Sequence, residues 1–224
     1  FKFDGGNIRE YVRAGLSSSD AVALNQAYFD FAAKYNFCEA KDTFGLAELP
    51  MPQRLRDKWH SWKTNGINTI VPDAINASLL GYRFLCPDMV GGGDYLDFQR
   101  RRRFDEELVV RFAECSALFP MIQFSIDLKR ILSKDNFDKV IKISRLHESF
   151  GDYIFELAKE CAINGEPMIR PLSYYDAEGG FDTITDEFML GDILVAPVLK
   201  KGQSERKTVL PKGKWKYIDG TIYE

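Results

Sequence analysis

Short apolar segments alternate with longer amphipathic ones along most of this chain, and this alternation constrains the fold more than any other feature. Runs of aromatic and aliphatic side chains favour strands, whereas apolar residues recurring at i, i+3 and i+4 favour helices. Alternating strands and helices are typical of βα units, so the sequence predicts an α/β fold with a parallel sheet. Strands are expected at residues 1–3, 37–40, 54–57, 82–86, 121–124 and 167–172, and helices after residues 17–20 and over 65–80, 104–117 and 137–163.

The pattern changes near residue 186. Residues 187–198 and 207–210 read as strands, turns follow at 200–202 and 211–213, and no helical periodicity separates them. Strands joined by short turns favour antiparallel pairing. We therefore expect βα units with a parallel sheet over residues 1–186 and the start of a separate antiparallel β domain over 187–224.

Charged residues follow several of the expected strands in turn. Asp4, Lys41, Asp57 and Asp88 each stand at or just after a strand end. The carboxyl ends of parallel strands meet at one face of a sheet, and barrels of βα units keep their active sites there. The sequence therefore predicts a candidate site at this face, although each acid alone could equally be a helix cap or an ion pair.

Two carboxylates at one face are the minimum equipment for cleaving a glycosidic bond, with one as nucleophile and the other as acid. Lys2 is expected to lower the pKa of Asp4, which keeps a nucleophile ionised. Trp59 and Trp62 would supply an apolar wall that raises the pKa of Asp57. Three nearby cations, Arg54, Arg56 and Lys58, would instead lower the pKa of Asp57. The sequence leaves open whether the apolar wall or the cations have the larger effect.

Composition argues against several other kinds of site. The net charge of −3 gives no reason to expect a nucleic-acid partner. The 4 cysteines are widely spaced and form no CxxC pair, so they read as buried thiols and not as a zinc site. The chain has 2 histidines, so its composition favours neither a metal site built from histidines nor a Ser-His-Asp triad. No metal or organic cofactor is therefore expected, and no apolar run reaches the roughly 18 residues of a membrane span.

Blocks spread over nearly the whole chain resemble glycoside hydrolase family 31, the retaining α-glycosidases, and they occur in the order of that family. Within it, the opening FKFD resembles the animal branch of myogenesis-regulating glycosidases. The blocks are FKFDGG at 1–6, Asp57 with Ser61 and Trp62, LGYRF at 80–84, PDMVGG at 87–92, LFPMIQFS at 118–125, GEPMIRPL at 165–172, LGDILVAPV at 190–198 and LPKGKW at 210–215.

The resemblance implies a role for each residue at the strand ends. Asp4 matches the nucleophile, and Asp57 matches the acid/base because a Trp follows five positions later, here Trp62. Lys2 matches a residue lining the sugar pocket, and Asp88 matches the acid of the glycine loop beside it. The family's substrate-binding Arg falls near Lys41.

The resemblance also implies a fold and a location. The family has an N-terminal β-sandwich, a (β/α)8 barrel and C-terminal β domains, and by that comparison this chain begins at about the fourth barrel strand. Half a barrel leaves sheet edges uncovered, so a piece of this length is expected to be unstable or to associate when made alone. A lumenal or extracellular location, and a glycoside or oligosaccharide as substrate, are what the resemblance favours.

Three departures from the family pattern leave a second interpretation open. Asn7 stands where the branch has an acid, Lys41 replaces the Arg, and residues 126–129 differ from relatives. A Lys lacks the planar fork of Arg, so sugar orientation is expected to change. The sequence predicts a retaining α-glycosidase for an α-galactoside or an α-glucoside. The alternative is an inactive relative or truncated product that acts, if at all, as a carbohydrate-binding protein of the secretory pathway.

Overall fold

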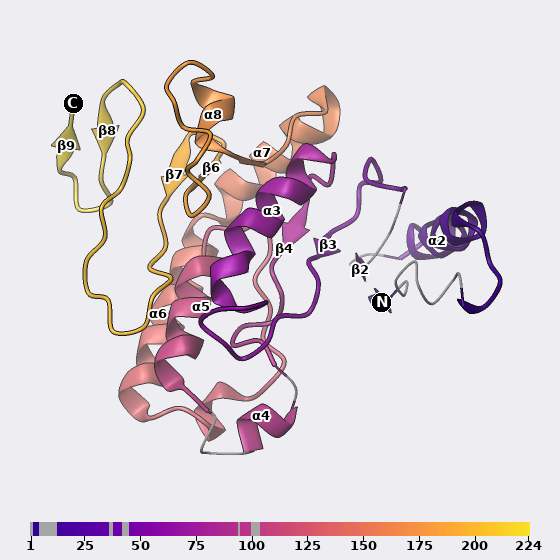
Figure 1. Ribbon diagram of the computed structural model, residues 1–224, viewed down its shortest axis with the longest axis horizontal. Coiled ribbons are helices and arrows are strands. Elements are labelled where there is room, and N and C mark those ends of the chain that lie inside the picture. The colour runs from indigo at the N-terminus through magenta and orange to yellow at the C-terminus, as the bar shows by residue number, and fades with distance from the viewer. Residues whose placement is uncertain (1, 5–12, 36–37, 42–44, 94, 100–103) are drawn as a thin grey trace.

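The structure is a computed structural model, and it describes residues 2–4, 13–35, 38–41, 45–93, 95–99 and 104–224. Figure 1 shows α2 and the first strands at one end of the molecule, a central body of helices, and the hairpin of β8 and β9 at the other end. Strands β1 to β4 form a sheet in sequence order. They are β1 (Lys2–Asp4), β2 (Glu39–Lys41), β3 (Gln53–Arg54) and β4 (Leu85–Cys86).

All described neighbours in this sheet are parallel, which confirms the prediction of βα units. The register places Asp4 opposite Lys41, Lys41 opposite Arg54, and Arg54 opposite Cys86. The charged residues Asp4, Lys41 and Arg54 therefore lie in one row across three strands, although they are far apart in the sequence.

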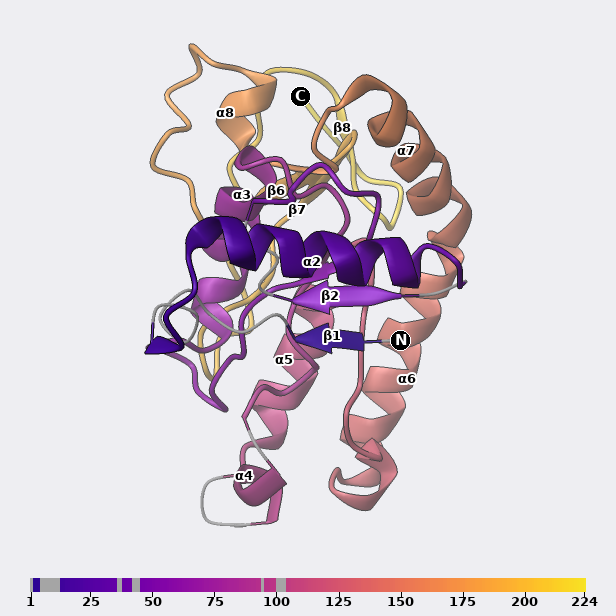
Figure 2. The same cartoon turned by 90° about the vertical axis from the view of Figure 1, so that its right-hand side faces the viewer.

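Helix α2 (Ser18–Ala32) begins where the sequence predicted, because Ser17 and Asp20 form a reciprocal capping box. Figure 2 shows this helix lying alongside β2 and β1. The expected helix over 65–80 is shorter and follows a 3₁₀ turn. The other helical elements of this half are η1 (Ile67–Thr69), α3 (Ile70–Leu79), α4 (Tyr95–Gln99), α5 (Glu106–Ser116) and η2 (Leu128–Arg130).

The prediction of one long helix over 137–163 is wrong, because the chain forms two helices there. They are α6 (Lys134–Ser149) and α7 (Gly151–Asn164), with Phe150 as the joint. Glycine is a poor helix former, so Gly151 allows the chain to change direction. The apolar pattern continues through the joint because both helices contribute to the same core, which includes Val140 and Ile154.

Three strand predictions also need correction. Residues 121–124 form no strand, although the Gln123 carbonyl accepts a hydrogen bond from the Val90 N–H at 2.9 Å. Residues 207–210 are irregular as well, and side chains anchor them. The segment 167–172 pairs antiparallel in a second sheet and not in the parallel one. The second half contains β5 (Ile169–Arg170), α8 (Leu172–Tyr175), β6 (Phe188–Leu190), β7 (Ile193–Val195), β8 (Trp215–Lys216) and β9 (Ile222–Tyr223).

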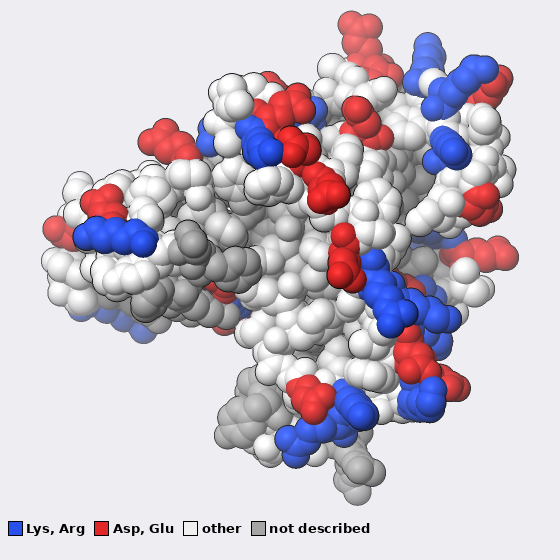
Figure 3. Space-filling model, turned by 180° about the vertical axis from the view of Figure 1, so that it is seen from behind, with Lys and Arg blue, Asp and Glu red and all other residues white. Residues whose placement is uncertain are grey.

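The main core packs α3, α5, α6 and α7 against β4 and the second sheet. Phe119 and Phe188 meet edge to face with ring centroids 5.2 Å apart at its centre. The described cysteines are free thiols; Cys86, Cys115 and Cys161 are buried as predicted, whereas Cys38 is only partly buried. Among the described residues, no helix combines the length and apolar character needed to cross a bilayer. Lys, Arg, Asp and Glu intermingle on the face seen in Figure 3.

Candidate active site

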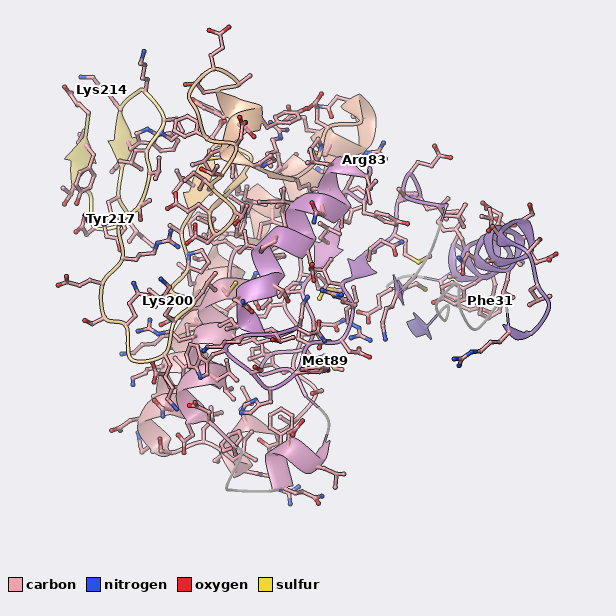
Figure 4. All side chains as sticks on the ribbon, viewed as in Figure 1. Phe31, Arg83, Met89, Lys200, Lys214 and Tyr217 are labelled. Carbon is pink, nitrogen blue, oxygen red and sulfur yellow. The ribbon has the colours of Figure 1, made fainter. Side chains whose placement is uncertain are left out.

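Arg54 is the last charged residue of this row and contacts three carboxylates. Its Nη1 is 2.9 Å from Asp57 Oδ1 and 2.5 Å from Asp88 Oδ1, and its Nε is 3.5 Å from Glu39 Oε1. The Arg54 side chain is 3% exposed. A buried guanidinium needs such partners, because an unpaired buried charge is strongly unfavourable. Arg54 thereby ties β3 to the first residue of β2 and to the segment that follows β4; Met89 marks this region in Figure 4.

Asp57 is the exposed member of this cluster. Its side chain is 68% exposed, while Lys41, whose Nζ lies 3.0 Å from Asp57 Oδ2, is 8% exposed. Partial burial raises the pKa of Asp57, but the hydrogen bonds and charges of Lys41 and Arg54 outweigh that and hold the pKa below its ordinary value. Asp57 is therefore an ionised carboxylate that is exposed to solvent and bound by the cations Lys41 and Arg54.

Asp88 lies beneath Asp57 and is 5% exposed at its side chain. One oxygen binds Arg54, and the other accepts the backbone N–H of Lys58 at 2.7 Å. Both oxygens of Asp88 thus serve to fix the cluster and the chain directly after Asp57. The structure places Asp88 in contact with Arg54 and Lys58, and its identification as a residue beside a sugar pocket stays a prediction.

The loop that follows Asp57 is closed by its own hydrogen bonds. Asn65, with φ +49°, donates from Nδ2 to the Asp57 carbonyl at 3.0 Å, and its carbonyl accepts the Trp59 N–H at 2.7 Å. The Gly93 N–H donates to the Lys58 carbonyl at 2.6 Å. Asn tolerates the left-handed region better than most residues, which suits it to this position. The loop is therefore closed on itself through Asn65 and joined to the glycine loop through the Lys58 carbonyl.

The two tryptophans of this loop differ in environment. Trp62 is half-buried against the main core, and its indole N–H donates to Asp105 Oδ2 at 2.9 Å. Trp59 is 59% exposed. Of the two, Trp59 is the one with an open face. His60 accepts the Asp105 N–H at 2.9 Å and also contacts the Gly91 carbonyl, so it links the glycine loop to the start of α5.

Asp4 and Lys2 are placed by the backbone of β1. Asp4 pairs in register with Lys41, and Lys2 pairs with Glu39. Their side chains lie outside what the structure describes. The backbone therefore puts Asp4 one strand away from the partner of Asp57, and the identification of Asp4 and Lys2 as site residues stays a prediction.

Sequence reasoning missed the central position of Arg54 and treated it only as a neighbour of Asp57. It also missed Glu39, which pairs with Arg54 and accepts a hydrogen bond from Gln123. The signal was present, because Glu39 and Lys41 are charged residues at both ends of a three-residue strand that is buried throughout. Buried charges within a strand predict partners on neighbouring strands.

The described residues bear on two other possibilities, a metal ion and a binding hollow. They contain no group of three or more His, Cys, Asp and Glu residues suited to a metal ion. A hollow of about 500 Å³ lies beside Glu39, Pro52 and the end of α2. It therefore opens near the starts of β2 and β3, away from Asp57.

Comparison with known proteins identifies relatives over the whole chain. The protein-family model of the glycosyl hydrolase family 31 C-terminal domain matches residues 165–224. Mouse myogenesis-regulating glycosidase is 30% identical over 243 residues, which cover 100% of this chain and 33% of that protein. An α-glucosidase of Saccharolobus solfataricus is 34% identical over 125 residues, covering 52% of this chain and 18% of the other.

A solved structure shares the fold. The crystal structure of the uncharacterized protein lmo2446 of Listeria monocytogenes superposes with a TM-score of 0.78 at 22% identity, covering 91% of this chain and 20% of that one. The chain spans about a third or less of the length of each of these proteins.

Proposed function

The chain belongs to glycoside hydrolase family 31, and on this premise we propose that it supplies the catalytic carboxylates of a retaining α-glycosidase. The observation that carries the proposal is the row of charges at the strand ends. Asp4 is in register with Lys41, and Lys41 binds Asp57 at 3.0 Å. Two carboxylate-bearing residues at the carboxyl ends of neighbouring parallel strands, with a cation on the strand between them, suit cleavage of a glycosidic bond.

In the proposed reaction Asp4 attacks the anomeric carbon while Asp57 protonates the leaving oxygen. This step forms a covalent β-linked glycosyl-enzyme and releases the aglycone. Asp57 then removes a proton from water, which attacks the anomeric carbon and frees Asp4. A retaining enzyme of this kind holds its carboxyl groups about 5–5.5 Å apart.

The acid step requires a proton on Asp57, whereas Lys41 and Arg54 favour its ionised form. We propose that a sugar hydroxyl draws the Lys41 ammonium away as substrate binds. The sugar also covers the exposed carboxylate, and loss of water raises the pKa of a carboxyl group. Arg54 remains bound to Asp88 throughout, so the base of the site stays fixed.

The proposed substrate is a terminal α-linked glucoside or galactoside, with Lys2 and Lys41 lining the sugar pocket. The names of two relatives, a glycosidase and an α-glucosidase, support this class. The four-stranded parallel sheet is proposed to be part of a (β/α)8 barrel, from about its fourth strand, followed by the start of a β-sandwich. A lumenal or extracellular location is proposed from the same resemblance.

The test uses the full-length product of the gene that encodes this chain. Fluorogenic α-glucosides, α-galactosides and α-xylosides are offered to it, to its Asp4→Asn variant and to its Asp57→Asn variant. Turnover of one sugar, lost by at least about 10²-fold in both variants, is the expected result. Binding of a sugar without turnover by the folded protein would instead identify a non-catalytic carbohydrate-binding relative.

A further inference from the structure

The two residues that flank Asp57 share one partner on helix α3. Arg56 Nε lies 3.0 Å from Asp73 Oδ2, and the Lys58 ammonium binds the same carboxylate oxygen. Asp57, between them, has a different set of partners, because its oxygens face Lys41 and Arg54. A single carboxylate thus holds the residue before and the residue after the proposed acid.

The Lys58 side chain makes this contact indispensable for the local structure. It is 0% exposed, and its Nζ also lies 3.0 Å from Thr69 Oγ1. Burial lowers the pKa of Lys58, and the charge and hydrogen bond of Asp73 oppose that effect. A fully buried ammonium without a carboxylate is strongly unfavourable, so Lys58 and Asp73 hold one another in place.

The same residue is fixed through its backbone. The Lys58 N–H donates to Asp88 at 2.7 Å, and its carbonyl accepts the Gly93 N–H at 2.6 Å. The chain after Asp57 therefore has little freedom once the Lys58 side chain is anchored. The chain before Asp57 is restrained by Arg56, which is 59% exposed at its side chain and has less support of this kind.

We propose that Asp73 is a positioning residue, which acts on the reaction through Asp57 by holding Arg56 and Lys58. This inference rests on the proposed role of Asp57 as acid/base. Asp73 itself needs no contact with substrate. Without it, the Asp57 carboxylate loses its alignment with the leaving oxygen, so the loss falls on proton transfer.

Proton transfer to the leaving group has a readout that general damage to the protein does not imitate. The dinitrophenolate of a dinitrophenyl glycoside leaves readily without a proton, whereas the release of phenol from a phenyl glycoside depends on proton donation by the acid. The experiment measures kcat/KM for both substrates, made with the sugar that the full-length protein hydrolyses. The variants are Asp57→Asn, Asp73→Asn and, as a matched control, Asp138→Asn, which removes the carboxylate of an exposed ion pair on α6.

The expected result is selective. Asp57→Asn and Asp73→Asn lower kcat/KM for the phenyl glycoside by about 10²-fold and for the dinitrophenyl glycoside by less than about threefold, and Asp138→Asn changes neither. An equal loss on both substrates, or no loss, with Asp73→Asn beside a selective Asp57→Asn overturns the role of Asp73 alone. A non-selective Asp57→Asn overturns both proposals.

A second variant guards against misfolding of Asp73→Asn. The double variant Lys58→Met/Asp73→Leu removes the buried ammonium together with its carboxylate, so no buried charge is left without a partner. It also releases Arg56. The same selective loss on the phenyl glycoside is expected, and equal rates with the native protein on both substrates overturn the proposal.

Discussion

The Lys41 ammonium lies 3.0 Å from the Asp57 carboxylate, although 16 positions separate the two residues in the chain. Lys41 ends strand β2, and Asp57 follows strand β3, so the parallel register brings them together. The pair makes the proposed acid an ionised group before substrate binds. Because the parallel register places this ion pair and the ion pair lowers the pKa of Asp57, the fold influences the pH dependence of the proposed reaction.

Replacing Lys41 by Met is expected to shift the pH profile. The cation holds the pKa of Asp57 down, and the acid step needs the protonated form, so activity falls as pH rises above that pKa. Removing Lys41 raises the pKa and moves the alkaline limb of kcat/KM upward by about one pH unit. KM is also expected to rise, because Lys41 is a proposed sugar ligand.

The measurement is the pH profile of kcat/KM for the full-length protein and its Lys41→Met variant. Lys63→Met is the control, since Lys63 is an exposed residue of the loop after Asp57. An alkaline limb that stays in place in Lys41→Met would show that another group controls the acid step.

Replacing Gly66 by Ala is expected to disturb the loop after Asp57. A Cβ there would lie 1.9 Å from the Ser61 carbonyl oxygen, so the backbone must shift. The expected loss is about 1–3 kcal/mol of unfolding free energy, as for other overpacked positions. Activity on the phenyl glycoside should fall as well, because the same loop carries Asp57.

Gly151→Ala is the matched control for that substitution. A Cβ at Gly151 meets nothing within 4 Å, and the residue begins α7. Alanine there is expected to stabilise the protein by about 0.4–1 kcal/mol. Urea unfolding of the two variants checks both signs, and a Gly66→Ala protein as stable as the native one would refute the described loop geometry.

Glu187 is expected to anchor the irregular segment 200–210 to the second sheet. Its buried carboxylate binds Arg206 Nη2 at 2.5 Å and accepts the Val209 N–H at 3.2 Å. Removing one partner of such a pair leaves the charge of the other without a counter-ion, so Glu187→Ala should destabilise the protein by about 3 kcal/mol. The exposed neighbour Asp186 is the control, and Asp186→Ala should stay within about 0.5 kcal/mol.

The pH dependence of this anchor has a defined sign. Burial raises the pKa of Glu187, which Val209 and Arg206 oppose only in part. A carboxyl whose folded pKa is raised stabilises the fold below its unfolded pKa, and this contribution is lost as pH rises through the folded value. Between about pH 4 and neutrality, unfolding free energy should therefore fall more in the native protein than in Glu187→Gln. Parallel curves for the two proteins would contradict this.

The strand ends could be predicted from the sequence because a local signal marks each one. Lys41 and Asp88 follow short, largely apolar segments, and parallel strands end at one face. The central position of Arg54 could not be predicted, since its partner Asp88 lies 34 positions away and depends on strand register. The side-chain partners of Asp73 are equally non-local.

The errors in the fold have similar causes. A short apolar segment such as 167–172 suits a parallel or an antiparallel strand, and only tertiary pairing selects the partner β6. The break at Phe150 was hidden because α6 and α7 keep their apolar residues in phase with one core. Residues 121–124 look like a strand because Met121 and Ile122 are apolar, yet they lack a ladder partner.

The most direct test of the central claim is to trap the glycosyl-enzyme. The full-length protein is incubated with the 5-fluoro glycosyl fluoride of the sugar that it hydrolyses, digested, and analysed by mass spectrometry. A retaining enzyme with Asp4 as nucleophile should carry the sugar on the peptide that contains Asp4, and Asp4→Asn should carry none. A protein that hydrolyses the sugar but is labelled at another residue, or at none, would contradict the account.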